Sequence, residues 1–434
     1  MSRLAVLPGP VANARIRAPT AMHILCVGGE DHYLRIPFLL ALQARGLRVT
    51  AAGTGEPAPF ARAGLAYHRF HFDRFLNPLA DRSGIAALKR LLASTRPDLV
   101  QSFDTKPNIL VPLAARGVRD LLVVRTINGM GWVYSSRSPL ALLLRPVQRV
   151  LHRLAARSTA ATVFQNREDQ AFFARHQMAG AGHSLLIPGS GVDIARVERD
   201  LAAGPSPAEL RKTLGLGTAE VVVTVTRLTR QKGIPTLLEA AAQVHKARPG
   251  VRFLLVGPRE SEGTLAVAQA EIDRHAPYVA ALGQRSDVPA LLRLADVFAF
   301  PTEYREGVPR ALLEAGLAGL PIVATDMPGC NDVIRDGWNG FLVPPRAPHL
   351  LARRILDLLH DRQAARAMGV RAATLVRQEF GLELTVTRYC RLYSKLMHPR
   401  SVVEQVPASG IETGAAAAPP DLRDAADCAP AGGP

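Results

Sequence analysis

The stretch M-H-I-L-C-V-G-G, residues 22–29, is an apolar run that ends in two glycines. A helical pattern, R-I-P-F-L-L-A-L-Q-A-R-G, follows at residues 35–46, and L-R-V-T-A-A-G at 47–53 has the composition of a second strand. Strand, glycine-rich turn, helix and strand in this order begin a doubly wound α/β domain. We therefore predict a Rossmann-like domain that starts after an irregular extension at residues 1–21.

The same alternation continues along the chain and predicts a second domain of this kind. The first domain, with further strands near Val100, Val123 and Val163, is assigned to residues 22–188, and the second to residues 189–375. Apolar runs in the second region predict strands at 220–227, 251–257, 297–301, 321–325 and 340–344. A helix at 376–400 is expected to pack back on the first domain. The Ala-, Pro- and Gly-rich residues 401–434 are expected to be disordered. The predicted fold class is α/β, with two Rossmann-like domains facing across a cleft.

Positive charge is concentrated at the N-terminal end of the chain. The formal net charge is +16, and residues 1–160 hold 22 Lys and Arg against 8 Asp and Glu, while the remaining residues hold 31 against 29. This asymmetry predicts an anionic partner for the first domain, either phospholipid, a diphosphate-bearing molecule or nucleic acid. Zinc-finger spacing and RNA-binding aromatic motifs are missing from the sequence, which disfavours nucleic acid.

The four cysteines are far apart in the sequence, with no C-x-x-C pair and no histidine cluster beside them. A disulfide framework or a zinc site is therefore not expected, and a reducing compartment fits. No apolar run approaches the roughly 18 residues that a membrane-spanning helix needs. Residues 1–21 lack the apolar core of a signal peptide. These features predict a protein on the cytoplasmic side.

Two charged stretches follow predicted strands of the second domain, where open parallel sheets bind their ligands. In T-R-L-T-R-Q-K-G (226–233), Arg227 and Lys232 lie in the loop before a helix, which suits an anion such as a diphosphate; a solvated loop with two surface cations is the alternative. In E-Y-R-E-G-V-P-R-A-L-L-E (303–314), Glu306 and Glu314 flank a bend and an apolar helix. They are either carboxylates for ligand hydroxyl groups or ordinary helix-end and surface acids.

The pattern E-G-V-P-R-A-L-L-E, followed by A-G-L-A-G-L-P-I-V-A-T-D-M-P-G and D-G-W-N-G-F-L-V-P-P, resembles the retaining GT-B glycosyltransferases of family 4 over residues 22–395. The resemblance implies that Glu306 contacts the donor sugar, that Glu314 binds the ribose, and that Arg227 and Lys232 neutralise the leaving diphosphate. It also implies backbone contacts to the donor from Gly28, Gly29, Gly283, Arg285, Gly307 and Val308.

The chemistry that the resemblance implies needs no dedicated protein nucleophile. Fixed cations and helix dipoles stabilise the charge that builds on the departing diphosphate. The leaving phosphate itself would act as the base. No D-x-D segment is present, so neither a metal nor a cofactor is expected, and the nucleotide sugar is a substrate.

Two segments depart from the family pattern in the first domain. Many relatives carry V-H-x-H-T and T-x-H-G, where this chain has V-Q-S-F-D-T-K (100–106) and T-I-N-G-M-G-W (126–132). Asn128 therefore stands at a position that is often His. Asn128 can hydrogen-bond a sugar but cannot take up a proton near neutral pH. Its alternative role is to form an Asn-Gly turn.

The segments T-I-N-G-M-G-W-V-Y, V-F-Q-N-R-E-D and G-S-G-V-D resemble a narrower group, which includes transferases that add a second sugar to undecaprenyl-diphospho-linked sugars. The implied substrates are a UDP-linked donor, of an N-acetylhexosamine or another sugar, and a lipid-linked sugar acceptor. Alternatives are a transferase with a soluble acceptor, a sugar-nucleotide epimerase, a homologue that only binds, and a non-catalytic basic protein that binds nucleic acid or membrane. A nicotinamide dehydrogenase is disfavoured because C-V-G-G-E-D-H is not G-x-G-x-x-G.

Residues 121–167 contain no Asp or Glu, and inside them Arg145, Arg149, Arg153 and Arg157 recur every four residues. On a helix these arginines span an arc of about 120°, opposite a similar arc of Leu and Val. Such a helix either lies on an anionic membrane surface or packs on the core with an arginine-rich solvent face. We expect the Leu face to point inward, the Arg face to meet lipid headgroups, and Pro146 to delay or kink the helix start. The expected location is the inner face of the plasma membrane, by peripheral association.

Overall fold

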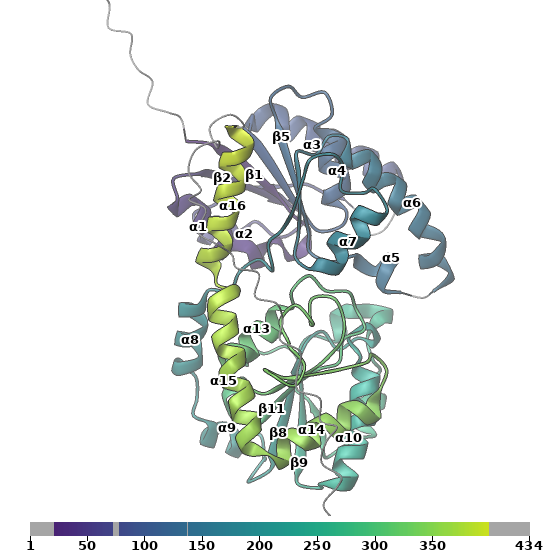
Figure 1. The fold of residues 1–434 in the computed structure, drawn as a ribbon, viewed down its shortest axis with the longest axis vertical. Coiled ribbons are helices and arrows are strands. Elements are labelled where there is room, and N and C mark those ends of the chain that lie inside the picture. The colour runs from purple at the N-terminus through teal and green to yellow at the C-terminus, as the bar shows by residue number, and fades with distance from the viewer. Residues whose placement is uncertain (1–20, 73–77, 137, 399–434) are drawn as a thin grey trace, which may run out of the picture.

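The computed structural model describes residues 21–72, 78–136 and 138–398. They form two α/β domains, stacked along the long axis of the molecule and each built on one parallel sheet (Figure 1). The predicted fold class, two Rossmann-like domains facing each other, is confirmed. The predicted N-terminal extension and C-terminal tail lie almost wholly outside the described residues. The structure gives bounds of helices and strands, so the domain limits themselves stay predictions.

The sheet of the N-terminal domain has the strand order β3-β2-β1-β4-β5-β6-β7. Its strands are β1 His23–Val27, β2 Arg48–Gly53, β3 Ala66–Arg69, β4 Leu99–Phe103, β5 Leu122–Ile127, β6 Ala161–Phe164 and β7 His183–Leu186. All five residues of β1 are buried, as expected for a central strand that is covered on both faces. This explains why its sequence is continuously apolar instead of alternating.

The sheet of the C-terminal domain has the strand order β10-β9-β8-β11-β12-β13. Its strands are β8 Glu220–Val225, β9 Val251–Val256, β10 Val279–Ala281, β11 Val297–Phe300, β12 Ile322–Thr325 and β13 Phe341–Val343. In both sheets the strand order reverses beside the first strand, between β1 and β4 and between β8 and β11. Open α/β sheets bind ligands at this reversal, beyond the carboxyl ends of the strands.

Three strands were not predicted from the sequence: β3, β7 and β10. Each lies at the edge of its sheet. Residues of β3 and β7 are largely exposed or half-buried, so they carry His, Tyr, Ser and Arg where a central strand carries Val and Leu. An edge strand pairs on one side only and needs less apolar surface, which is why its sequence signal is weak.

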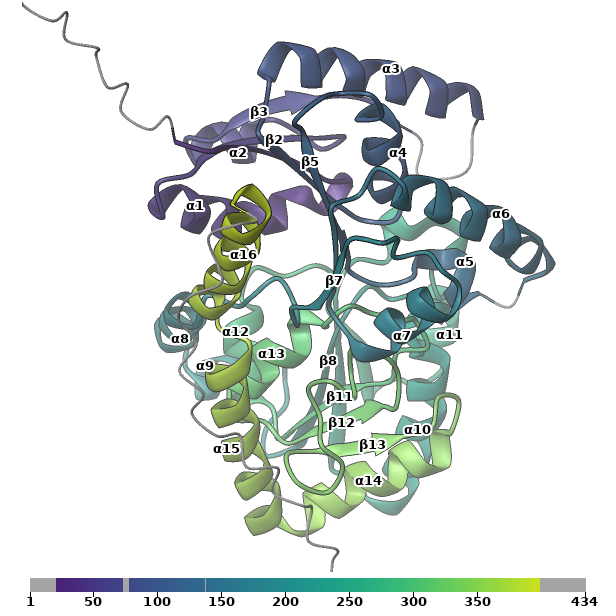
Figure 2. The same ribbon diagram turned by 45° about the horizontal axis from the view of Figure 1, so that its top comes forward.

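Helices cover both faces of each sheet (Figure 2). In the N-terminal domain they are α1 Ile36–Ala44, α2 Ala58–Arg62, α3 Pro78–Thr95, α4 Pro107–Ala114, α5 Gly131–Ser135, α6 Pro139–Ala156 and α7 Arg167–Arg175, with the short 3-10 helix η1 Glu30–Arg35 before α1. In the C-terminal domain they are α8 Ile194–Ala203, α9 Pro207–Thr213, α10 Ile234–Ala247, α11 Gln269–Asp273, α12 Val288–Leu294, α13 Arg310–Leu317, α14 Pro348–His360 and α15 Arg362–Glu379, with 3-10 helices η2 Arg230–Lys232 and η3 Glu260–Leu265.

The last described helix, α16 Leu382–Met397, returns to the N-terminal domain (Figure 1). The chain crosses beside the connector between the domains. There the amide of Val192 donates to the carbonyl oxygen of Phe380, and the amide of Leu382 donates to the carbonyl oxygen of Val192. Tyr389 and Tyr393 of α16 are almost fully buried in the same core cluster as β1 and α1. The phenol of Tyr389 lies 3.3 Å from the hydroxyl of Thr126 on β5. The C-terminal end of the described chain is therefore an integral part of the first domain's core.

Candidate active site

A cleft of about 530 Å³ lies between the two domains. The N-terminal domain contributes the segment after β1, including Asp31 and Arg35, together with Asp104 after β4 and Asn128 after β5. The C-terminal domain contributes the segment from Glu306 to Arg310 after β11, and Glu314 of α13. Both domains therefore present their strand-end loops at the point where the strand order reverses.

Glu306 and Lys232 meet directly. The ammonium Nζ of Lys232 contacts Oε1 of Glu306, and it also lies 5.1 Å from the centre of the Tyr304 ring. Thr302 donates to the same carboxylate oxygen at 3.4 Å. Only 9% of the Lys232 side chain and 17% of the Glu306 side chain are exposed, so the alternative of a solvated surface cation is wrong for Lys232. The sequence placed the two groups on separate loops, and their contact was not predicted.

The loop that carries Glu306 is held against the N-terminal domain. Glu306 forms an antiparallel bridge with Gly129, and its carbonyl oxygen accepts a hydrogen bond of 2.9 Å from the carboxamide of Asn166. Gly307 follows in very close contact: a Cβ there would lie 2.1 Å from Oε1 of Gln165 and 3.1 Å from the backbone of Asn128. Only glycine allows this approach. Val308 lines the cleft beside it, just before α13 begins at Arg310.

A buried ion pair joins the domains at the same loop. The guanidinium of Arg305 lies 2.8 Å from Oδ1 of Asp169, whose side chain is fully buried. The backbone amide of Arg305 also donates to the hydroxyl of Ser135 at 3.1 Å. Burial raises the pKa of Asp169, and the Arg305 cation opposes that rise. Because Asn166 and Arg305 both donate to it, the carboxylate has the partners that a buried charge requires.

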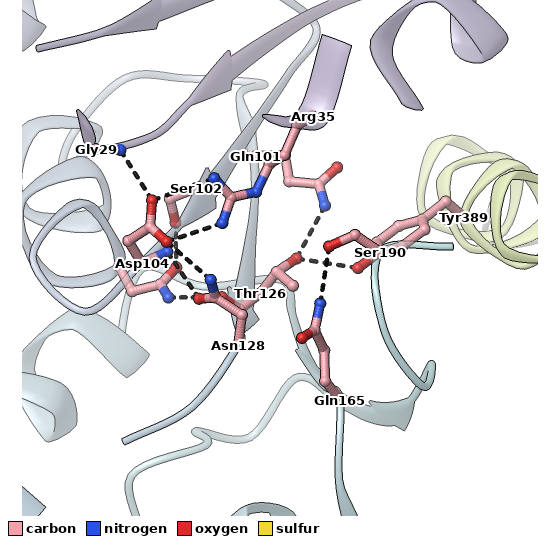
Figure 3. A network of polar contacts seen from close by, with 11 residues as sticks. Gly29, Arg35, Gln101, Ser102, Asp104, Thr126, Asn128, Gln165, Ser190 and Tyr389 are labelled. Atoms are coloured by element: carbon pink, nitrogen blue, oxygen red, sulfur yellow. Dashed lines mark hydrogen bonds and ion pairs between the residues drawn. The ribbon is translucent and has the colours of Figure 1, made fainter. Parts of the chain in front are cut away.

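The N-terminal wall of the cleft is organised around Asp104, as Figure 3 shows. Its carboxylate accepts from the Gly29 amide at 2.9 Å, from Arg35 at 2.8 Å and from the Asn128 carboxamide at 2.8 Å. Burial opposes the charge of Asp104, but Arg35, Asn128 and Gly29 together hold the pKa of its carboxyl below the usual value. Arg35 is itself buried and stacks over the Phe103 ring at 4.7 Å. The result is a fixed carboxylate at the edge of the cleft.

The predicted residues of this wall have different surroundings from those expected. Asn128 lies at the cleft, but its amide nitrogen donates to Asp104 and its oxygen accepts from the Asp104 amide at 3.0 Å. A sugar contact by Asn128 stays a prediction, and any ligand would share it with Asp104. The Gly29 amide likewise already has Asp104 as acceptor. Gly28 makes room for a side chain: a Cβ there would lie 2.2 Å from the His32 ring.

Asp104 and Arg35 were not predicted as site residues. Asp104 directly follows β4, so the rule that ligands bind beyond strand ends could have selected it. The comparison with V-H-x-H-T drew attention to the missing histidines instead. Arg35 carries no comparable signal, because nothing local distinguishes a buried arginine in a short 3-10 helix from a surface one.

Glu314 lines the cleft one turn into α13, as expected from the sequence. Its carboxylate already has a protein partner, the Arg310 guanidinium at 2.7 Å. Glu314 therefore has a partner without any ligand, and a ribose contact stays a prediction. Arg310 and Glu314 together place a cation and an anion on the same face of the helix, toward the cleft.

Three further predicted residues lie away from Glu306. Arg227 leaves β8 and pairs with Glu262 at 2.8 Å instead of meeting Lys232. Arg285 donates from Nε and Nη2 to the two carboxylate oxygens of Asp287, at 2.7 and 2.6 Å, and this hydrogen bonding raises the pKa of Arg285. Gly283 takes a left-handed backbone with φ +67°. Ser286 and Val288, which follow Arg285, line the cleft. Among the described residues, the predicted catalytic and donor-binding ones that do not line it are Gly28, Gly29, Arg227, Lys232, Gly283 and Arg285.

Of the four arginines proposed to touch a membrane, three lie on α6 and Arg157 directly follows its last residue; none of them lines the cleft. The helix begins at Pro139 and runs through Pro146, so the expected delay at Pro146 is wrong. Ser138 caps it by accepting from the Ala141 amide. The expected inward Leu face is also wrong. The buried residues are Ala141, Gln148, His152, Ala155 and Ala156, and the large exposed ones are Leu140, Leu142, Leu143, Val147 and Val150.

Two sequence families cover most of the chain. Residues 207–374 match the model described as glycosyl transferases group 1, and residues 38–172 match the model described as glycosyltransferase family 4. Together with two facing Rossmann-like domains and a charged cleft between them, these matches define a glycosyltransferase of the GT-B class. The chain belongs to the group 1, family 4 glycosyltransferases, as predicted, and is an enzyme.

Individual relatives agree with this assignment. The chain is 25% identical to the N,N'-diacetylbacillosaminyl-diphospho-undecaprenol alpha-1,3-N-acetylgalactosaminyltransferase of Campylobacter jejuni, over 85% of this chain and 97% of the relative. It is 28% identical to the UDP-Gal:alpha-D-GlcNAc-diphosphoundecaprenol alpha-1,3-galactosyltransferase of Escherichia coli, over 62% and 68%. It is 31% identical to the GDP-mannose-dependent alpha-(1-6)-phosphatidylinositol monomannoside mannosyltransferase of Mycobacterium tuberculosis, over 65% and 72%. Among solved structures, Anabaena Alr3699/HepE in complex with UDP-glucose matches with a TM-score of 0.70 at 23% identity, covering 86% of this chain and 100% of that one.

Proposed function

We propose that the enzyme transfers a sugar from a UDP-linked donor to a lipid-diphosphate-linked sugar, with retention at the anomeric carbon. The observation that carries this proposal is the pair of charged walls across one cleft. Glu306 lies on one wall and is paired behind it with the buried Lys232, and Asp104 with Arg35 lies on the other wall. Cleavage of a sugar–diphosphate bond needs a cation beside the leaving group and an acceptor for sugar hydroxyls beside the reacting carbon.

Each side chain has a distinct part in this proposal. Lys232 stabilises the departing diphosphate, and Glu306 accepts hydrogen bonds from the donor sugar. Their mutual contact holds both charges in place before the donor arrives, so little reorganisation is needed during the reaction. Arg227 reaches the diphosphate only after exchanging its Glu262 partner. The reaction needs no metal in this scheme, and added chelator is expected to leave activity unchanged.

Relatives support the choice of donor and acceptor. The names of the Campylobacter and Escherichia relatives both specify a sugar on diphospho-undecaprenol, and the Escherichia name specifies UDP-galactose. The mycobacterial relative is named for GDP-mannose, so family membership alone leaves the base open. The basic N-terminal region, with 22 Lys and Arg against 8 Asp and Glu in residues 1–160, suits an acceptor that carries a diphosphate.

Asp104 is the group that we assign to the acceptor. Its carboxylate is at the N-terminal wall and is kept ionised by Arg35, so it can accept a hydrogen bond from the attacking hydroxyl group. Asp104→Asn is expected to raise KM for the acceptor and to leave the affinity for nucleotide unchanged. Equal losses for donor and acceptor would instead indicate a structural role for Asp104.

A donor screen tests the proposed function. Purified protein with an undecaprenyl-diphospho-sugar in detergent would be offered a panel of nucleotide sugars, and both nucleoside diphosphate release and lipid product mass would be measured. A lipid product heavier by one sugar is the expected result, and NMR of its anomeric proton reports retention or inversion. Nucleotide release without a lipid product would overturn the proposed acceptor. A product with inverted anomeric configuration would overturn the proposed retention.

A further inference from the structure

The helix α6 turns its large apolar side chains away from the protein. Leu140 is 58% exposed, Leu143 73%, Val147 47% and Val150 52%. At 100° per residue these four lie within an arc of about 80° along the whole helix. We call this surface the α6 ridge. Helices of globular proteins normally turn such a stripe toward the core. Single exposed apolar residues are common on protein surfaces, but these four form one continuous band.

The inward face of α6 shows that this orientation is built into the packing. It carries small and polar residues, Ala141, Gln148, His152 and Ala155, and it packs against α4 and α5. The arginines then fix the helix from its side. Arg145 donates to the carbonyl oxygens of Val133 at 3.2 Å and Ser136 at 3.0 Å, and Arg153 donates to that of His176 at 2.8 Å. Rotating the ridge inward would break these hydrogen bonds and bury guanidinium groups.

The stretch of chain that contains the α6 ridge carries only positive charge. The sequence from 121 to 167 contains Arg residues and no Asp or Glu. Arg157 is exposed and lies about 20° from Val150 around the helix axis, seven residues further along. An apolar band bordered by cations complements the acyl and headgroup layers of an anionic monolayer. A second copy of the chain would bring two basic surfaces together, which disfavours a dimer through this face.

We propose that the α6 ridge inserts into the surface of an anionic phospholipid membrane, with Arg157 and its neighbours meeting the headgroups. No helix in the described residues is long and apolar enough to cross a membrane, so the contact is interfacial. This proposal assigns the lipid contact to the Leu and Val face, the opposite face from the one expected from the sequence. It stands independently of the transfer reaction, because binding to lipid can be measured without any donor or acceptor.

A short stretch of chain connects the cleft to the α6 ridge. The chain runs from Asn128 at the cleft through α5 directly into α6, and Ser135 at the end of α5 accepts from the amide of Arg305, next to Glu306. Figure 2 shows α5 beside the junction of the domains and α6 extending outward from it. The N-terminal wall of the cleft and the α6 ridge are therefore joined by a short stretch of chain that also contacts the loop carrying Glu306.

Liposome flotation of the full chain tests the α6 ridge directly. Vesicles of phosphatidylglycerol and phosphatidylethanolamine would be compared for wild type, for Leu143→Gln/Val147→Gln/Val150→Gln, and for Val370→Gln. Val370 is 65% exposed on α15 of the other domain and is the control, because the change is of the same kind: an exposed apolar side chain is replaced by uncharged glutamine. The ridge variant is expected to bind at least about tenfold more weakly. The control is expected to bind like wild type.

Three outcomes of this comparison would overturn the proposal: unchanged binding of the ridge variant, an equal loss in the control, and loss of a dimer in sedimentation with lipid binding retained. Melting temperature and nucleotide affinity check that the ridge variant is folded.

A fluorescent probe gives a second readout that does not depend on removing side chains. The chain has two Trp residues, Trp132 and Trp338, and replacing both with Phe leaves a silent background. Leu143→Trp in that background is expected to shift its emission to the blue on vesicle binding and to be quenched by lipids brominated on the acyl chain. Val370→Trp in the same background is the control and is expected to do neither. An unshifted, unquenched Trp at 143 on bound vesicles would overturn insertion.

Discussion

The proposed transfer reaction depends most on Glu306, at the cleft, and on its partner Lys232. Both are largely buried, so each charge depends on the other for its solvation. Lys232 and Thr302 both contact the same carboxylate oxygen of Glu306, Oε1, so the second oxygen is the one that we expect to accept from a sugar hydroxyl. This asymmetry allows Glu306 to bind a sugar hydroxyl without releasing the lysine.

Glu306→Gln is therefore expected to reduce turnover by about a hundredfold or more, while nucleotide binding changes little. The amide keeps the shape of the side chain but removes the charge that Lys232 faces. Steady-state kinetics and nucleotide titration would measure the two effects. Glu303→Gln is the control, since Glu303 lies on the same loop but pairs with the exposed Arg346 at 2.5 Å. Wild-type turnover in the Glu306 variant would exclude the proposed sugar contact.

Two buried histidines make stability depend on pH. Burial, with Arg35 close by, lowers the pKa of His32 to about 3, and burial with Arg125 lowers that of His152 to about 3. Both are neutral in the folded protein, while in the unfolded chain they protonate below about pH 6.5. The unfolded state then binds more protons, so stability is full above pH 6.5 and falls as pH decreases from 6.5 toward 3.

We expect the free energy of unfolding to fall by about 1.4 kcal/mol per histidine between pH 7.5 and 5.5. Urea unfolding at the two pH values would measure it, and His152→Gln should remove about half of the loss. A stability that stays flat over this interval would show that the two histidines are protonated in the folded protein.

At the scale of elements, the loop between β11 and α13 depends on close backbone approach. The loop brings Glu306 against Gly129 and leaves no space at Gly307 for a side chain. Packing of this kind transmits small changes to the catalytic groups, because a methyl group added at Gly307 would press on the Gln165 side chain and the Asn128 backbone.

Gly307→Ala is expected to reduce turnover at least tenfold by displacing Glu306. The nearest atom is the side-chain oxygen of Gln165, at 2.1 Å from the added carbon. Gln165→Ala should therefore restore part of the activity when combined with Gly307→Ala. Full loss in the double variant would place the obstruction at the Asn128 backbone, which lies 3.1 Å away.

At the scale of the molecule, two connections decide how the domains face each other. One is α16, which leaves the second domain and buries Tyr389 and Tyr393 in the first. The other is the Arg305–Asp169 pair, which lies directly behind the catalytic loop. The first is part of the continuous chain and is apolar, whereas the second is an ion pair that can open without unfolding either domain.

Arg305→Gln is expected to lower the free energy of unfolding by about 1 to 3 kcal/mol, because it leaves a buried carboxylate with Asn166 as its main donor. It should also increase the radius of gyration in solution scattering. Arg335→Gln is the control, since Arg335 pairs with the exposed Glu379 at the surface. Identical melting and scattering for Arg305→Gln and the control would show that the pair does not hold the domains together.

Sequence patterns predicted the central strands of both sheets and the strand-end loops that carry Glu306 and Lys232. They missed β3, β7 and β10, whose edge positions need little apolar surface. They also missed Asp104 and Arg35. Those two residues are 69 positions apart, so their ion pair exists only once β1 and β4 are adjacent.

The sequence by itself determined the class of fold and the membership in a glycosyltransferase family. The reason is that strand and helix periodicity and the order of motifs are local properties of the chain. Tertiary structure alone decided which charged groups meet, such as Lys232 with Glu306, and which face of α6 is exposed. Periodicity defines the faces of a helix but not the neighbour that covers one of them. That choice depends on how closely the small residues of α6 allow it to approach α4 and α5.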